Sequence, residues 1–328
     1  MLSVETDHSW LSAHLFFQGD LYGPVCDRII LEVAAPFVRR CQRQNWISTY
    51  FFIRYRERGP HVRLRLYGER ETLERDVRPA LETHVEETLP EELRAYPYAG
   101  GSVSDGRQDA SPLHWIPYEA EVDRYGGPDG VALAETFFYY SSETSLALLR
   151  QIEIGDRSAR LGKGLLAMLV LLHVFLEDAE TAAALAQHYS AGYLKRRARE
   201  ERLYTSWMEA FDTGYDRQAG NLTVYVRTAW SHLDGSEPLT PVLDTYRTQL
   251  IEIRDDFKRL HAERRLARQG VVPDTWEHCV RMIVPSYLHM MNNRLGLSIP
   301  EESYLAYLIT RALHPTVEQD TPASSFAA

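Results

Sequence analysis

The strongest constraint on the fold of this chain is a change in the periodicity of its apolar residues. Residues 61–66 (HVRLRL) alternate polar and apolar side chains, which is the two-residue period of a β-strand. From about Val131 onward, apolar side chains recur at helical spacing instead. The sequence therefore predicts an α+β fold, in which a small mixed sheet region with packed helices precedes a mostly helical region.

The first third of the chain contains the predicted strands and two helices. We expect strands at residues 11–17, 46–55, 61–67 and 113–116, and helices at residues 23–44 and 70–87. Gly59 and Pro60 separate the second and third strands, which predicts an antiparallel hairpin. Residues 97–112 are rich in Gly, Ser, Pro and Asp, and predict a long loop.

One helix in the second part of the chain stands out by its seam of apolar side chains. These recur three and four residues apart, at Leu243, Tyr246, Leu250, Ile253, Phe257 and Leu260. Such a seam predicts packing within a helical bundle, and Gly270 is expected to cap the end of the helix. The apolar run of residues 165–176 is too short for a bilayer span and predicts a buried core helix.

The length of 328 residues suits one large domain with a substantial core. We expect a single domain over residues 1–314, with its sheet in residues 1–128 and its helical part in residues 129–314. The polar segment 315–328 (PTVEQDTPASSFAA) is expected to be a disordered tail.

Composition excludes several classes of function. The formal net charge of −10 argues against bulk binding of nucleic acid. The three cysteines (Cys26, Cys41 and Cys279) lie far apart and form no CxxC pair, which fits a reducing compartment. The N-terminus has acidic residues and no apolar signal, so we expect a cytoplasmic protein without a membrane partner. Motifs for ATP, dinucleotides, zinc and hydrolase triads are absent, so we expect neither a cofactor nor a metal.

The strand at residues 61–66 carries the first candidate site. His61, Arg63 and Arg65 share one face because side chains alternate along a strand. Two guanidinium groups roughly 7 Å apart suit a ligand with two acidic groups, since each can form a bidentate fork with a carboxylate. The competing interpretation is an ordinary solvated outer face of the sheet.

Two further segments carry polar side chains at helical spacing. Glu121 and Arg124 stand three residues apart and can pair in a helical turn, either to fix the arginine for an anion or as a plain surface ion pair. Ser286, His289 and Asn293 form a polar stripe on an apolar helix. His289 is the candidate acid–base group, with Ser286 or Asn293 orienting it, although a satisfied core histidine fits equally.

A basic run, Lys195-Arg196-Arg197-Ala198-Arg199, could hold an acidic peptide or RNA. Glu200 and Glu201 follow it directly, which favours a solvated helix face instead.

Three segments in this order resemble the C-terminal, or elimination, domain family of class I lantibiotic dehydratases. The segments are FFIRYRERGPHVRLRLYG, YEAEVDRYGG and SYLHMMNNRLG, the last followed by Glu301-Glu302. The family also includes thiopeptide-type bacteriocin biosynthesis proteins that consist of this domain alone. The resemblance extends over about residues 9 to 314.

The resemblance implies an enzyme that removes glutamate from glutamylated Ser or Thr of a ribosomal precursor peptide, leaving dehydroalanine or dehydrobutyrine. It assigns the family's functional positions to Arg63, Arg65, Glu121, Arg124 and His289. We expect substrate contacts from their neighbours His61, Ser286, Asn293 and Arg294. No glutamylation domain is evident in the sequence, so the implied partners are a precursor peptide with its leader and a separate glutamylation protein that uses glutamyl-tRNA.

Two other functions fit the same resemblance. Relatives of this size form the central pyridine of thiopeptides by a formal [4+2] cycloaddition of two dehydroalanines, with loss of the leader peptide. The third hypothesis is that the protein is a non-catalytic carrier of the precursor peptide. The sequence leaves open whether the protein is a homodimer.

Overall fold

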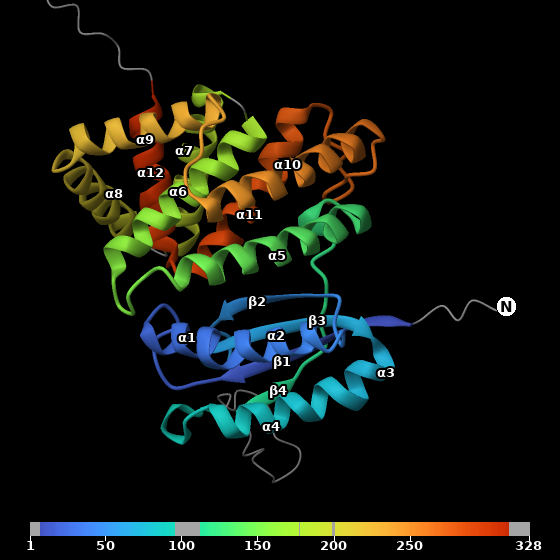
Figure 1. Ribbon diagram of the computed structural model, residues 1–328. Helices are drawn as coiled ribbons and strands as arrows, with labels where there is room; N and C mark the ends of the chain where they lie inside the picture. Colours follow the sequence, from blue (N-terminus) through green and yellow to red (C-terminus); the bar gives the residue numbers. More distant parts are fainter. Residues whose placement is uncertain (1–6, 96–111, 177, 199–200, 315–328) are drawn as a thin grey trace, which may run out of the picture.

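The computed structural model describes residues 7–95, 112–176, 178–198 and 201–314. It confirms the α+β class, with a four-stranded sheet near the N-terminus and helices after it (Figure 1). The predicted loop of residues 97–112 lies almost wholly outside the described residues, and the predicted tail of residues 315–328 lies wholly outside them.

The four strands lie in the order β2-β3-β1-β4. Their bounds are β1 His8–Phe16, β2 Thr49–Tyr55, β3 His61–Glu69 and β4 Leu113–Trp115. The predicted hairpin is confirmed, because β2 pairs with β3 across the Gly59-Pro60 turn. One expectation was wrong: all three described pairings are antiparallel, so the sheet is not mixed.

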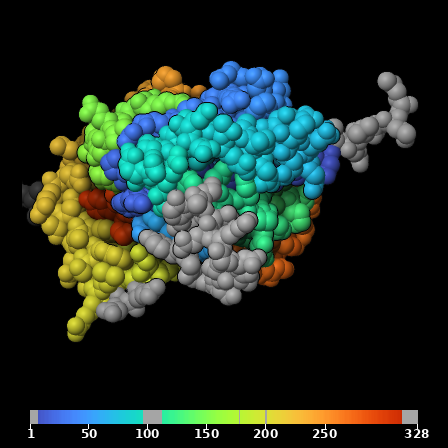
Figure 2. Space-filling model, turned by 90° about the horizontal axis from the view of Figure 1, so that it is seen from below, coloured from blue at the N-terminus to red at the C-terminus, as the bar shows by residue number. Residues whose placement is uncertain are grey.

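Helices cover the apolar face of the sheet, where Val62, Leu64 and Leu66 are fully buried. The predicted helix after Gly23 is continuous but contains a π-helical segment, as does the helix after Glu69. Figure 2 shows these helices, in blue and cyan, spread over this side of the molecule. Their segments are α1 Pro24–Arg28, η1 Ile29–Ala34, α2 Ala35–Arg43, α3 Arg70–Thr72, η2 Leu73–Val77 and α4 Arg78–Thr88.

The chain passes through two short 3₁₀ turns, η3 (Glu91–Leu93) and η4 (Asp123–Tyr125), and then becomes helical. In the second part, the described residues form eight helices, and this part stacks on the sheet through α5 in Figure 1. They are α5 Pro128–Leu149, α6 Arg157–Leu176, α7 Ala179–Arg197, α8 Glu201–Asp216, α9 Ala219–Asp234, α10 Pro241–Ala262, α11 Trp276–Leu295 and α12 Ile299–Leu313.

Two sequence expectations for this part are confirmed and one was wrong. The six-residue apolar seam lies on α10, and every member of it is buried. The apolar run of residues 165–176 lies on α6, which is long and apolar enough to span a membrane but is mostly buried among other helices. Gly270 does not cap α10, since the helix ends at Ala262 and Arg264 turns away with φ +56°.

The sheet lies between two layers, because α5 and α11 pack on its second face along β2. Phe51, on that face, belongs to the core of the helical part. The α11 helix starts at a Thr275 side chain that accepts a bond from the His278 amide, and it ends at Gly296 in the left-handed region.

A buried ion network locks the junction between sheet and helices. Arg54 of β2 donates to Asp27 of α1 at 2.7 Å, and Arg160 of α6 pairs with the same carboxylate. Asn293 of α11 accepts from the Arg54 amide at 3.0 Å and donates to the Arg54 carbonyl at 2.9 Å. A side chain at Gly296 would meet Arg54 Cζ and Arg160 Nη1 at 2.8 Å, so this turn requires glycine.

Candidate active site

A cavity of about 160 Å³ lies between the polar face of the sheet and α11. It is lined by all five residues that the sequence singled out for chemistry, namely Arg63, Arg65, Glu121, Arg124 and His289. They come from three separate segments: β3, the η4 turn with the residues just before it, and α11. The fold thus brings the three sequence motifs to one place.

Arg63 and Arg65 rest on aromatic rings within this cavity. The Arg63 Cζ atom lies 3.3 Å from the centre of the Tyr55 ring, and Arg65 Cζ lies 4.5 Å from that of Tyr118. Burial lowers the pKa of Arg65 to about 10, which still leaves it charged at neutral pH. Because Arg65 is only 6% exposed, the solvated-face interpretation of this strand was wrong.

His61 supports Arg63 from the side and lines neither this cavity nor the larger one beside it. Its Nδ1–H donates to the Gly59 carbonyl at 2.9 Å, and its Nε2 accepts from Arg63 Nε at 3.2 Å. Burial, opposed in part by the Gly59 bond, lowers the pKa of His61 to about 4. The expected substrate contact of His61 is therefore replaced by a positioning role as a neutral imidazole.

Glu121 and Arg124 form the predicted ion pair, with Arg124 Nη1 2.9 Å from Glu121 Oε2. Arg124 Nε also donates to the Ser286 hydroxyl at 3.2 Å. The helical spacing had suggested that Ser286 orients His289. In the structure, Ser286 bonds Arg124 instead. The pair leaves Arg124 fixed at the boundary of the cavity, with donors available to an anion.

His289 is oriented by a residue to which the sequence reasoning gave no role. Its Nδ1 lies 2.9 and 3.1 Å from the two carboxylate oxygens of Glu302 on α12. Glu302 is fully buried, and burial raises the pKa of its carboxyl even though His289 opposes the shift. The Ser298 and Glu301 capping box predicts where α12 starts, but it does not show that Glu302 lies opposite His289.

Asn293, which was expected to orient His289, and Arg294, which was expected to contact substrate, both bond groups at the junction. Asn293 borders the cavity, but both atoms of its amide bond the Arg54 backbone. Arg294 is fully buried and lines neither cavity; it donates to Ser142 Oγ at 3.0 Å and to the Met290 carbonyl at 2.8 Å. The expectation that Arg294 contacts substrate was wrong, because its guanidinium is enclosed by protein.

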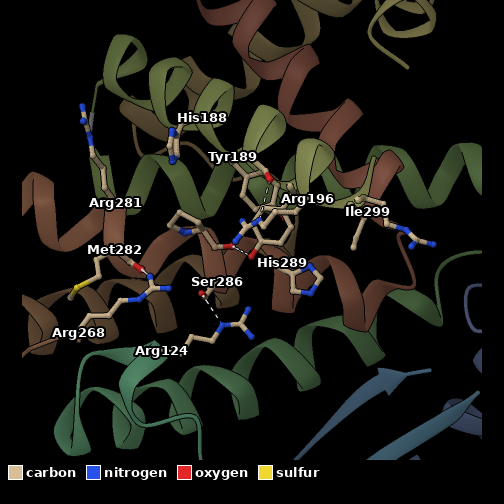
Figure 3. Close-up of a pocket in the computed structure, with 14 residues that line it drawn as sticks. Arg124, His188, Tyr189, Arg196, Arg268, Arg281, Met282, Ser286, His289 and Ile299 are labelled. Atoms are coloured by element: carbon tan, nitrogen blue, oxygen red, sulfur yellow. Dashed lines mark hydrogen bonds between the residues drawn. The ribbon is translucent and has the colours of Figure 1, made fainter. Parts of the chain in front are cut away.

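A second cavity of about 460 Å³ adjoins the first and shares Arg124 and His289 with it. Figure 3 shows Ser286, Arg124 and His289 at its lower edge, with residues of α7 above them. His289 therefore faces two connected spaces. In the described residues, no group of three His, Cys, Asp or Glu side chains could hold a metal ion.

The sequence was compared with models of known families. The model of the lantibiotic biosynthesis dehydratase C-terminal domain matches residues 10–313, nearly the whole chain. The chain belongs to this family. The match includes every motif that had suggested the resemblance, and a search of curated proteins finds no match.

Solved structures of similar fold include two proteins of about the same extent and part of a longer one. "Crystal structure of TsrL" has 21% identity and a TM-score of 0.64, with 93% of this chain and 94% of that chain covered. "Pyridine synthase, TbtD, from thiomuracin biosynthesis" has 19% identity, a TM-score of 0.68, and 93% and 97% covered. The tRNA dependent lantibiotic dehydratase MibB from Microbispora sp. 107891 has 20% identity, a TM-score of 0.59, and 92% and 28% covered. At these identities the likeness establishes a shared fold.

Proposed function

We propose that this member of the lantibiotic dehydratase C-terminal family eliminates glutamate from glutamylated Ser or Thr of a precursor peptide, leaving dehydroalanine or dehydrobutyrine. The observation that carries the proposal is one cavity lined by three arginines and a histidine that is held by a buried carboxylate. Elimination needs cations for the carboxylates and a base for the Cα proton, and this cavity offers both.

The arginines answer the negative charge of the substrate. A glutamyl ester carries a free carboxylate, and breaking its Cβ–O bond releases a second one. Arg63 and Arg65 extend from one face of β3, and Arg124 approaches from η4. Fixed guanidinium groups stabilise the leaving carboxylate more than the neutral ester, so they lower the barrier.

In this proposal, His289 takes the Cα proton. Its Nδ1–H is held by Glu302, so Nε2 is the nitrogen available for chemistry. In the proposed step, Nε2 accepts the Cα proton, the electron pair forms the Cα=Cβ bond, and glutamate leaves with the Cβ–O electrons. The carboxylate of Glu302 stabilises the resulting imidazolium, which then returns its proton to water.

The proposal implies two partners. One is the precursor peptide with its leader, and the other is a glutamylation activity that uses glutamyl-tRNA. The name of the structural neighbour MibB, a tRNA dependent lantibiotic dehydratase, is consistent with such a pathway.

The test is mass spectrometry of a glutamylated precursor peptide incubated with the protein. We expect loss of one glutamate per modified residue, and His289→Gln should slow the loss by about 10²–10⁴-fold. His278→Gln, at an exposed position on the same helix, is the matched control and should keep full turnover. No glutamate loss with the unaltered protein would overturn the proposal.

A second candidate is formation of a thiopeptide pyridine by formal [4+2] cycloaddition of two dehydroalanines. The observation in its favour is the pair of connected cavities on either side of His289, which could receive two segments of one peptide. Loss of the leader peptide from an already dehydrated precursor would support it. Binding of the precursor without any mass change would support a carrier role instead.

A further inference from the structure

The larger cavity has a concentration of positive charge, of which the proposed elimination step uses only Arg124. Five arginines line it, and none of its 14 lining residues is acidic. This is notable in a chain whose formal net charge is −10. The arginines come from η4, α7, the segment after α10, and α11: they are Arg124, Arg196, Arg197, Arg268 and Arg281.

Contacts within the protein hold some of these arginines in place without using all their donors. Arg268 Nη1 donates to the Met282 carbonyl at 3.0 Å, and Arg196 Nε donates to the Gly192 carbonyl at 3.1 Å. Arg196 also lies over the Tyr193 ring, with 4.5 Å between Cζ and the ring centre. A guanidinium has five N–H donors, so each of these side chains keeps donors for a ligand.

The two remaining arginines are at the outer part of the cavity. Arg281 is 63% exposed and pairs with Glu277 at 2.7 Å, which is a pair that solvent screens. Arg197 belongs to the basic run at the end of α7 and is exposed. This run is therefore not only a solvated helix face, because Arg196 and Arg197 both line the cavity.

We propose that the larger cavity binds an acidic segment of the substrate peptide, next to the residue that reacts in the smaller cavity. This inference rests on the proposed function and names the substrate class that the site prefers. Arg124 and His289 border both cavities, so a single extended peptide can occupy both at once. Its Asp or Glu side chains would form charge-assisted hydrogen bonds with the arginines.

The shape and lining favour a peptide over an RNA. A volume of about 460 Å³ accommodates several side chains, and Tyr189, Met282 and Pro285 provide apolar surface among the arginines. A third cavity continues from it through His188 and Arg281, and is lined partly by Leu176, Ala184 and Leu185. A lining that contains both arginines and apolar side chains suits a peptide that carries both acidic and apolar residues.

The experiment compares two glutamylated peptides that differ only near the reacting residue, one with two Glu residues and one with two Gln residues. Turnover and KM are measured for each, with the full-length protein. We expect KM to be about tenfold lower for the acidic peptide at low salt, and this preference to shrink as salt is added. The Arg197→Gln/Arg281→Gln double variant should lose the preference.

A matched double variant controls for the loss of net charge. Arg202→Gln/Arg217→Gln removes two exposed charges that line none of these cavities, and it should keep the preference. Equal KM values for the two peptides, with normal glutamate loss, would overturn this inference and leave the proposed function intact. Absence of glutamate loss from both peptides would overturn the proposed function instead.

Two competition experiments test whether the cavity binds another anion instead, namely free glutamate or RNA. Inhibition by free glutamate that disappears in the Arg197→Gln/Arg281→Gln variant would assign the cavity to the released product and overturn the peptide assignment. Inhibition by polyadenylate that disappears in the same variant would assign it to RNA and overturn it as well. Binding of the acidic peptide that neither competitor reduces in this way would support it.

Discussion

Two groups of arginines at the same junction have opposite surroundings. Arg54 and Arg160 are enclosed, and both are paired with Asp27 and bonded to carbonyls at the end of α11. Arg63 and Arg65, on the next strand, face a cavity and rest on aromatic rings. The first group has its charge compensated by a buried carboxylate. In the second group, the carboxylate that pairs with Arg63 is that of the exposed Glu57, at 3.4 Å, a pair that solvent screens, and Arg65 rests on the Tyr118 ring.

The difference shows that burial of an arginine does not by itself indicate its task. Arg54 is 1% exposed and Arg65 is 6% exposed, so exposure hardly separates them. The partner does: a carboxylate within the protein closes a charge pair, while an aromatic ring leaves the guanidinium open to a bidentate anion. We therefore expect the pairing of Arg54 and Arg160 with Asp27 to contribute mainly to the free energy of unfolding. We expect Arg63 and Arg65 to contribute mainly to turnover.

The largest effect is expected when Asp27, the carboxylate that Arg54 and Arg160 share, is removed. Asp27→Ala leaves Arg54 and Arg160 buried without a counter-charge, so we expect a loss of about 3–5 kcal/mol in unfolding free energy. Urea denaturation measures it. Asp20→Ala removes an exposed partner of Arg56, 3.5 Å away, and should cost less than about 1 kcal/mol. Equal losses in the two variants would contradict the contrast.

The open group is tested by Arg65→Lys. An ammonium keeps the charge but cannot form the bidentate fork, so glutamate loss should slow by about 10²–10³-fold while the protein stays folded. Single-turnover mass spectrometry gives the rate, and circular dichroism reports folding. The control is Arg78→Lys, which also removes an arginine from an aromatic ring, that of Trp115, but lines no described cavity. Normal turnover by Arg65→Lys would exclude it from carboxylate binding.

The next prediction concerns the pH dependence of stability, which depends on the buried histidines beside Arg63. Burial is the main cause that lowers the pKa of His61 to about 4 and that of His14 to about 3, so the unfolded chain binds protons first as pH falls below about 6.5. Stability should fall from pH 7 to pH 5 by about 2 kcal/mol for each such histidine. His61→Asn should reduce the pH dependence by its share, measured by urea unfolding at both pH values. An unchanged pH dependence would show that folding does not lower the pKa of His61.

The smallest effect on stability is expected at Glu121, because its pair with Arg124 is more than half exposed on the Glu121 side. Glu121→Gln should change unfolding free energy by less than about 1 kcal/mol. Its effect on turnover should pass through Arg124, so losses in Glu121→Gln and Arg124→Gln should be strongly non-additive. Additive losses in a double-mutant cycle would give the two residues independent roles.

Much of the fold could be predicted because periodicity is a local property. The alternation at residues 61–66 placed Arg63 and Arg65 on one face, and the a/d seam of α10 was buried as expected. Whether that face was covered could not be predicted, since α5 and α11, which cover it, are distant in the sequence. The partners of Ser286 and His289 were missed for the same reason: spacing on one helix does not show what lies opposite it.

The junction has a consequence for how such a protein can change over evolutionary time. Among the described residues, Asn293 is the member of the Arg54 network that also borders the smaller cavity. The residues that set the distance between β3 and α11 are thus almost entirely different from those that line the cavity. Substitutions at Arg63, Arg65 or Glu121 would change the lining of the cavity and leave this network unchanged. A lineage built on this plan can therefore diversify its products by drift within the cavity, provided that Gly296, Asp27 and their arginines stay fixed.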